Sequence, residues 1–203
     1  MKARGLLLAT LLFAGCGSSP PTRFFTLTPV GSSERNSTTS TSPMQVDAVH
    51  LPAMLDRKQM VRETGSETLS IDDRDQWGAP LGEMARNVLA RDLAARMPHG
   101  SIIFPDAPAP ASATHLVVNV TSFDEDADGT VRLEGSWSLL RGNTNAPVMT
   151  RDVALEDHAT VGEPAAQAAA MSKLLGRVAD DVARQVAAFP NSSTEAHPNI
   201  GCG

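Results

Sequence analysis

The most metal-like string in the sequence is Asp124-Glu125-Asp126-Ala127-Asp128-Gly129, with carboxylates at its first, third and fifth positions and glycine at its sixth. This spacing matches the opening of an EF-hand loop, whose oxygen ligands bind Ca²⁺. The twelfth position of such a loop supplies a bidentate glutamate, but here it is Gly135, inside a stretch that alternates like a strand. The pattern therefore favours a β-hairpin with Asp128-Gly129 at its tip over a weak calcium site, and we predict no resident metal.

Residues that commonly carry catalysis do not form a recognisable arrangement. The five histidines stand at positions 50, 99, 115, 158 and 197 without metal-ligand spacing, and there is no Gly-x-Ser-x-Gly turn or phosphate-binding loop. Tyrosine is absent from the chain. We therefore expect a protein that is not an enzyme and that needs no cofactor.

Cysteine occurs twice, and Cys16 stands in a context with a known chemistry. Two basic residues near the start precede the uncharged stretch 5–15, which is shorter than the roughly 20 residues of a membrane span and is typical of a secretory signal. Ala14 and Gly15 then precede Cys16, an order that resembles the lipobox of bacterial lipoproteins. The alternative is an ordinary secreted protein in which Cys16 follows these small residues by chance.

Lipidation of Cys16 would convert its sulfur to a thioether and attach two or three acyl chains such as palmitate. One chain binds a membrane only marginally, whereas several make attachment effectively permanent. Gly17, rather than an aspartate, follows the cysteine, which resembles the outer-membrane sorting signal of enterobacterial lipoproteins. We expect an outer-membrane protein that faces the periplasm. Cys202 could not pair with a lipidated Cys16, so it is an inert thiol or forms an intermolecular disulfide.

The charge of the chain limits its partners. Removal of residues 1–15 takes away Lys2 and Arg4, so the net charge of −6 becomes −8. An acidic chain has no basic footprint for nucleic acid, and charge does not draw it to anionic lipid. Nucleic acid is therefore excluded as a partner, and membrane attachment depends on the covalent anchor.

Composition divides the chain into four parts. Residues 1–15 are the predicted signal peptide, and residues 16–43 combine the lipid anchor, a short extended segment and a Ser/Thr-rich linker. Residues 44–189 have the length of one globular domain, and residues 190–203 are predicted to be a disordered tail. As a flexible tether, residues 17–43 would reach about 30 Å.

The predicted domain alternates strand patterns with two helix patterns. Strands are expected at 23–27, 45–51, 59–63, 68–72, 101–104, 116–121, 131–139 and 148–156. Helical spacing of apolar residues predicts one helix from Pro80 towards Pro98 and another from Pro164 to residue 189. Trp137 shares its parity with apolar neighbours and is expected in the core. The fold class is α+β, a single domain with an antiparallel or mixed β-sheet and two helices packed on one face.

Several short motifs, taken in order, resemble a known family. They are Phe24-Phe25-Thr26-Leu27 after the lipobox, Val46 to Pro52, Trp77-Gly78-Ala79-Pro80-Leu81, Leu116 to Phe123, and Gly135-Ser136-Trp137. Over roughly residues 12–189 they are similar to the ABC-type transport auxiliary lipoproteins, the paraquat-inducible protein C-like family. The stretch from Trp77 to Pro98 is the most specific part, and Phe24 and Phe25 stand where the family often has tyrosines.

The resemblance implies an accessory lipoprotein of an MCE-type system that moves lipids between the inner and outer membranes. Such a protein would dock, without catalysis, on a periplasmic MCE-domain protein, and a second copy of the chain is a further candidate partner through an edge strand. The competing hypothesis is a carrier that holds acyl chains in its own cavity, but the clean strand alternation favours docking. Phe24 and Phe25 are the candidate partner-binding residues, with packing on their own domain or contact with the bilayer as alternatives.

Overall fold

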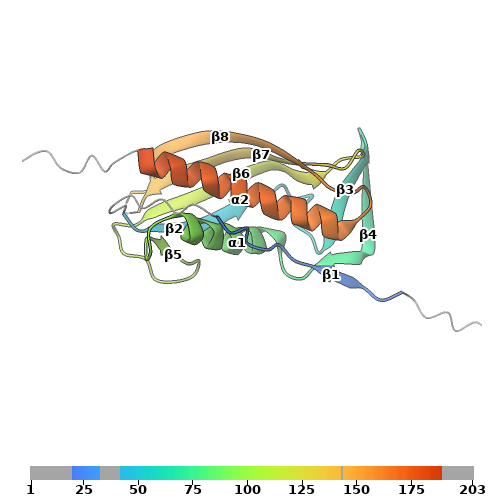
Figure 1. The fold of residues 1–203 in the computed structure, drawn as a ribbon, viewed down its shortest axis with the longest axis horizontal. Helices are drawn as coiled ribbons and strands as arrows, with labels where there is room; N and C mark the ends of the chain where they lie inside the picture. Colours follow the sequence, from blue (N-terminus) through green and yellow to red (C-terminus); the bar gives the residue numbers. More distant parts are fainter. Residues whose placement is uncertain (1–19, 33–41, 143, 189–203) are drawn as a thin grey trace, which may run out of the picture.

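The computed structural model describes residues 20–32, 42–142 and 144–188. Cys16, Cys202, most of the Ser/Thr-rich linker and the C-terminal tail lie outside these residues. The described chain forms one mixed sheet of eight strands and two helices (Figure 1). Helices α1 (Leu81–Arg96) and α2 (Pro164–Ala188) lie side by side on one face of the sheet. The predicted fold class, a single α+β domain, is confirmed.

The sheet is built around β6, which has partners on both edges. The strands are β1 (Arg23–Phe25), β2 (Met44–His50), β3 (Gln59–Gly65), β4 (Thr68–Trp77), β5 (Ile102–Ile103), β6 (Thr114–Glu125), β7 (Thr130–Arg141) and β8 (Ala146–His158). On one side β6, β7 and β8 pair in antiparallel order. On the other side β6 pairs in parallel with β2 along its first half and with β3 at its end. β5 extends the sheet from β2, and β4 and then β1 extend it from β3.

Inward and outward side chains alternate along β6 and β7, so one face of these strands is buried and the other is exposed. Leu116, Val118, Leu133 and Trp137 all point inward and are at most 2% exposed. The indole N–H of Trp137 donates to Oδ2 of Asp181 on α2 at 3.0 Å, so this inward face lies under the helix. The predicted burial of Trp137 is confirmed.

The apolar stripe of α2 forms the other half of the core. Five members are at most 2% exposed, namely Met171, Leu174, Leu175, Val178 and Val182, and Val186 is partly buried against the core. Phe189, the last residue of the expected stripe, lies outside the described residues. Of the two helices in the described chain, neither is long and apolar enough to cross a bilayer.

A β-bulge bends the sheet where β6 passes Gly135. The register of the β6–β7 pair shifts between Val120 and Ser122, and Gly135 has a φ of 152°. A Cβ at this position would lie 2.1 Å from the Asn119 carbonyl oxygen, so only glycine fits. Bulges of this kind increase the local twist and bend the strand, which helps the sheet to curl.

Candidate functional site

The chain enters the domain through β1, which adds to the edge of β4. The two strands run in parallel, with Arg23 beside Asp75 and Phe25 beside Trp77. The Arg23 guanidinium donates from Nε and Nη2 to the two carboxylate oxygens of Asp75 at 2.7 and 2.8 Å. The Gly78 N–H donates to the Phe25 carbonyl at 2.8 Å. β1 is therefore bonded to the domain through both backbone and side chains.

After β1 the chain crosses the two helices. The Thr28 N–H donates to Ser172 Oγ of α2 at 3.1 Å, and the Val30 N–H donates to Asp92 Oδ1 of α1 at 2.7 Å. Arg96 Nη1 donates to the Val30 carbonyl at 3.0 Å. We call residues 23–30 the N-terminal segment, because they form one continuous contact with the sheet edge and both helices.

These contacts correct one expectation. The sequence predicts that residues 17–43 act as a single tether with a reach of about 30 Å, but the N-terminal segment is part of the folded domain. Only residues 17–22 separate Cys16 from β1. Residues 33–41, which lie outside the described chain, form the connection from the N-terminal segment to β2 rather than the route to the anchor.

A buried ion pair holds the second half of the N-terminal segment. Asp92 is 0% exposed and Arg96 is 4% exposed. Burial raises the pKa of Asp92 to about 6, against the opposing effects of the Val30 N–H and the Arg96 charge. Arg96 Nε also donates to Asp180 Oδ1 of α2 at 2.5 Å. Arg96 thus joins α1, α2 and the N-terminal segment.

The two candidate phenylalanines point in opposite directions, as neighbours on a strand do. Phe25 is partly buried and packs against the hydrophobic core, with the Arg23 guanidinium 5.7 Å from its ring centroid. Phe24 pairs with Gln76 and remains 68% exposed. Packing on the protein's own domain accounts for Phe25 and not for Phe24. Their role in partner binding stays a prediction.

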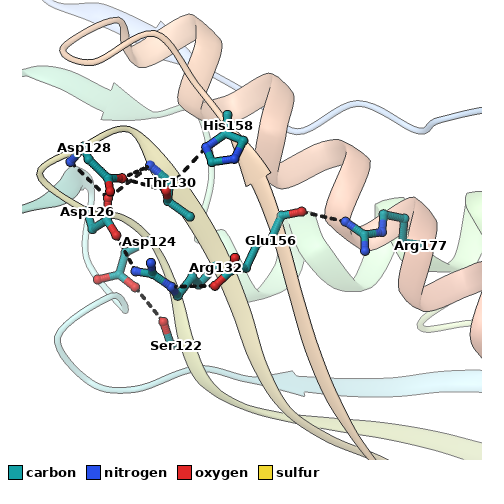
Figure 2. Close-up of polar contacts among 9 residues, drawn as sticks. All are labelled: Ser122, Asp124, Asp126, Asp128, Thr130, Arg132, Glu156, His158 and Arg177. Carbon is teal, nitrogen blue, oxygen red and sulfur yellow. Dashed lines mark hydrogen bonds and ion pairs between the residues drawn. The ribbon is translucent and has the colours of Figure 1, made fainter.

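The acidic string forms the hairpin between β6 and β7, as predicted. Gly129 adopts a φ of 86° at the tip, a left-handed conformation that glycine accepts without strain. The Thr130 N–H donates to Oδ1 of both Asp126 and Asp128, at 3.0 and 2.9 Å (Figure 2). The Thr130 hydroxyl is the main cause of a lowered Asp128 pKa, about 2. These carboxylates accept hydrogen bonds from the turn itself instead of surrounding a common centre.

We expect millimolar calcium to leave the melting temperature of the protein unchanged. Arg132 already forms an ion pair with Asp126, and its Nε donates to Glu156 Oε1 at 2.9 Å (Figure 2). A calcium ion would have to displace this cation, and Gly135 cannot supply the closing carboxylate. Calorimetry and thermal melts test this expectation. A saturable calcium-dependent shift that disappears in Asp126→Ala would contradict it.

Elsewhere the described residues offer no clear chemical site. They contain no group of three His, Cys, Asp or Glu side chains able to hold a metal ion. An open hollow of about 520 Å³ lies between β2, α1 and the loop after β5, and Gln45, Asp47, Arg86 and Asp106 line it. Arg86 Nη2 lies 2.9 Å from Asp106 Oδ2 across this hollow. Charged residues and the apolar Val46, Ala107 and Pro108 line it together, and it is open to solvent, unlike the enclosed and mostly apolar pocket that holds an acyl chain.

The protein is a small α+β domain in which a curled mixed sheet carries two helices on one face. The N-terminal segment is bonded to the same domain. Domains of this class are also found in solved structures. An uncharacterized protein matches with a TM-score of 0.68 and 19% identity, over 82% of this chain and 99% of that chain. A Xanthomonas campestris protein of the DUF330 family matches with a TM-score of 0.63 and 16% identity, over 81% and 95% of the two chains. These likenesses show the fold alone. Curated proteins yield no match by sequence.

The chain belongs to the family of ABC-type transport auxiliary lipoprotein components, whose sequence model matches residues 25–183. The matched region begins at the last residue of β1 and ends in α2, so it includes residues 25–30 of the N-terminal segment, the rest of the sheet and most of the helix layer. The resemblance identified from the sequence motifs is confirmed. The family's description gives its members an accessory role in transport, and as lipoproteins they are membrane-anchored.

Proposed function

We propose that this protein is the non-catalytic docking subunit of an MCE-type lipid-transport system, held on the outer membrane by lipidated Cys16. The family supports the accessory role and the lipid anchor. The short distance in sequence between Cys16 and β1 supports a protein that works close to its membrane. A periplasmic MCE-domain protein is the partner that we propose.

The observation that carries the docking proposal is the filled interior. The inward side chains of the sheet and the helices pack into one cluster whose members are at most 9% exposed. A carrier would need an enclosed apolar cavity large enough for an acyl chain, whereas the hollow between β2 and α1 is open to solvent and lined in part by charged residues. The geometry therefore supports recognition by the surface over lipid carriage inside the domain.

The uncovered face of the sheet and the edge of β8 are the proposed docking surface. β8 runs for 13 residues and pairs only with β7 within the described chain. Along its outer edge it has backbone groups that another chain can complete, apart from the Glu156 carbonyl, which accepts from Arg177 Nη1 of α2 at 2.6 Å. Beside it, the outward side chains are polar or charged, as in the contact between Ser138 Oγ and Thr150 Oγ1 at 2.9 Å and the pair of Arg132 with Glu156.

Site-specific photo-crosslinking in cells tests this proposal. A photoreactive residue replaces Asp152 on β8 or, as a matched control, Arg184 on the solvent side of α2, whose side chain is 70% exposed. We expect the β8 position to crosslink to an MCE-domain protein and the α2 position not to do so. Failure of the Asp152 position to capture an MCE component, together with stoichiometric lipid in the purified protein, would favour the carrier hypothesis instead.

Cys16→Ser is expected to move the protein from the membrane fraction to the soluble fraction. The stretch 5–15 is too short to span a bilayer, which takes about 20 residues, so the acyl chains are the only anchor proposed. Cell fractionation with mass spectrometry of the N-terminus measures the effect. Cleaved, unlipidated variant that still sediments with membranes would count against the anchor. Cys202→Ser is the control and should leave the protein in the membrane fraction.

A further inference from the structure

The connection between the anchor and the folded domain is short in sequence. Six residues, 17–22, separate Cys16 from Arg23, and Pro20 and Pro21 are among them. A fully extended chain spans at most about 3.6 Å per residue, so Arg23 lies within roughly 25 Å of the lipidated cysteine. Consecutive prolines favour a semi-rigid extended conformation. β1 and its surroundings are therefore held near the membrane surface.

The first exposed large hydrophobic side chain after the anchor in the described chain is Phe24. Phe24 is 68% exposed, the highest exposure among the large hydrophobic residues that the structure describes as exposed. It stands on a strand whose pairing with β4 and whose Arg23–Asp75 bonds fix its direction. An aromatic side chain at this position adds an apolar contact next to the acyl chains, and aromatic residues are enriched at the level of the lipid headgroups.

The charges around Phe24 do not oppose such a contact. Residues 23–25 of β1 lie beside 75–77 of β4, and residues 56–58 form the loop that enters β3 beside the end of β4, where the Trp77 N–H donates to the Lys58 carbonyl. The three stretches 23–25, 72–77 and 56–59 therefore lie next to one another. These three stretches carry four cations and four carboxylates, namely Arg23, Arg57, Lys58, Arg74, Asp56, Asp72, Asp73 and Asp75. The local net charge is zero, whereas the chain without residues 1–15 carries −8. This end of the domain is less repelled by an anionic headgroup layer than an average part of its surface.

We propose that Phe24 inserts into the lipid surface beside the anchor, so that the β1 end of the domain lies on the membrane. The proposal rests on the anchor at Cys16. Figure 1 places β1 at one end of the molecule and the start of β8 at the other. With Phe24 in the headgroup region, the domain stands with a fixed end towards the bilayer, and the start of the β8 docking edge points away from it.

Quenching by brominated lipid tests the proposal in the full lipidated chain. Phe24→Trp is reconstituted in phosphatidylcholine vesicles with and without bromine on the acyl chains. Val148→Trp is the matched control, because Val148 is 56% exposed near the start of β8. The native Trp77 and Trp137 are 5% and 0% exposed, so they contribute a protected background. Mass spectrometry of each sample records whether Cys16 carries its acyl chains.

We expect the emission added by Phe24→Trp to shift to shorter wavelength on reconstitution and to be quenched by brominated lipid, while that of Val148→Trp shows neither effect. Lipidated Phe24→Trp protein whose emission is not quenched would overturn the insertion of Phe24 and leave the anchor intact. A shift to shorter wavelength without quenching would mean that a second copy covers Phe24, which also overturns it. Protein bound to membranes without acylated Cys16 would instead contradict the proposed anchor, and the insertion with it.

Discussion

Trp137→Ala is expected to lower the free energy of unfolding by about 3–5 kcal/mol, the usual cost of emptying a large buried aromatic site. Trp137 is 0% exposed and is the largest of the fully buried side chains. It lies in the middle of β7, a strand with a partner on each edge, and its N–H bonds to Asp181 of α2. Neither the sheet nor the helix can move into the space without breaking other contacts.

Chemical denaturation followed by circular dichroism measures this cost. Val148→Ala removes an exposed apolar side chain from the neighbouring strand β8 and should change stability by less than about 0.5 kcal/mol. Trp137→Phe keeps most of the packing but loses the hydrogen bond to Asp181, so we expect a smaller loss than in Trp137→Ala. A loss under about 1 kcal/mol for Trp137→Ala would mean that the core refills this space.

The core could be predicted from the sequence because its signal is periodic. Trp137 shares its parity with Leu133, and the stripe of α2 repeats every three or four residues. The hairpin at the acidic string was also predictable, because Gly135 replaces the ligand that would close a calcium loop. In each case the side chain types along one short stretch carry the information, and no distant residue needs to be known.

The N-terminal segment shows why other parts could not be predicted. Thr28 and Val30 are held through their backbone groups, and backbone bonds leave no pattern in the sequence. Asp92 and Arg96 are four residues apart on a helix and look like an ordinary surface ion pair. Gly176 inside α2 was the available clue, because a Cβ there would lie 3.2 Å from Val30 Cβ, and glycine inside a helix often marks a close approach.

Arg96→Met should cost about 3–5 kcal/mol near neutral pH, because removing one partner leaves the other charge buried and uncompensated. Methionine keeps much of the side-chain volume, so loss of packing contributes little. The variant loses the bonds from Arg96 to Asp180 and to the Val30 carbonyl. We therefore expect the second half of the N-terminal segment to open as well, seen as faster amide hydrogen exchange at Val30.

The cost of Arg96→Met should depend on pH. Burial raises the pKa of Asp92 from 3.8 to about 6 in the folded protein, so the folded state binds a proton that the unfolded state lacks between these values. The contribution of Asp92 to the stability of the wild type is therefore complete below pH 3.8, and it is lost as the pH rises through about 6. Without the Arg96 charge, the pKa of Asp92 rises further. The free energy of unfolding then falls by a larger amount when Asp92 ionises. Destabilisation by Arg96→Met should be larger near pH 7.5 than near pH 5.

Asp92→Asn and the double variant Asp92→Asn/Arg96→Met separate the ion pair from the other bonds of Arg96. Asparagine can still accept a hydrogen bond from the Val30 N–H but carries no charge, so the pH dependence that Asp92 causes should disappear in both variants. In this background Arg96→Met should cost less at pH 7.5 than in the wild type, since no buried carboxylate is left unpaired. Equal costs in both backgrounds at every pH would show that Arg96 acts only through Asp180 and Val30. Denaturant unfolding of the four proteins at the two pH values decides between these outcomes.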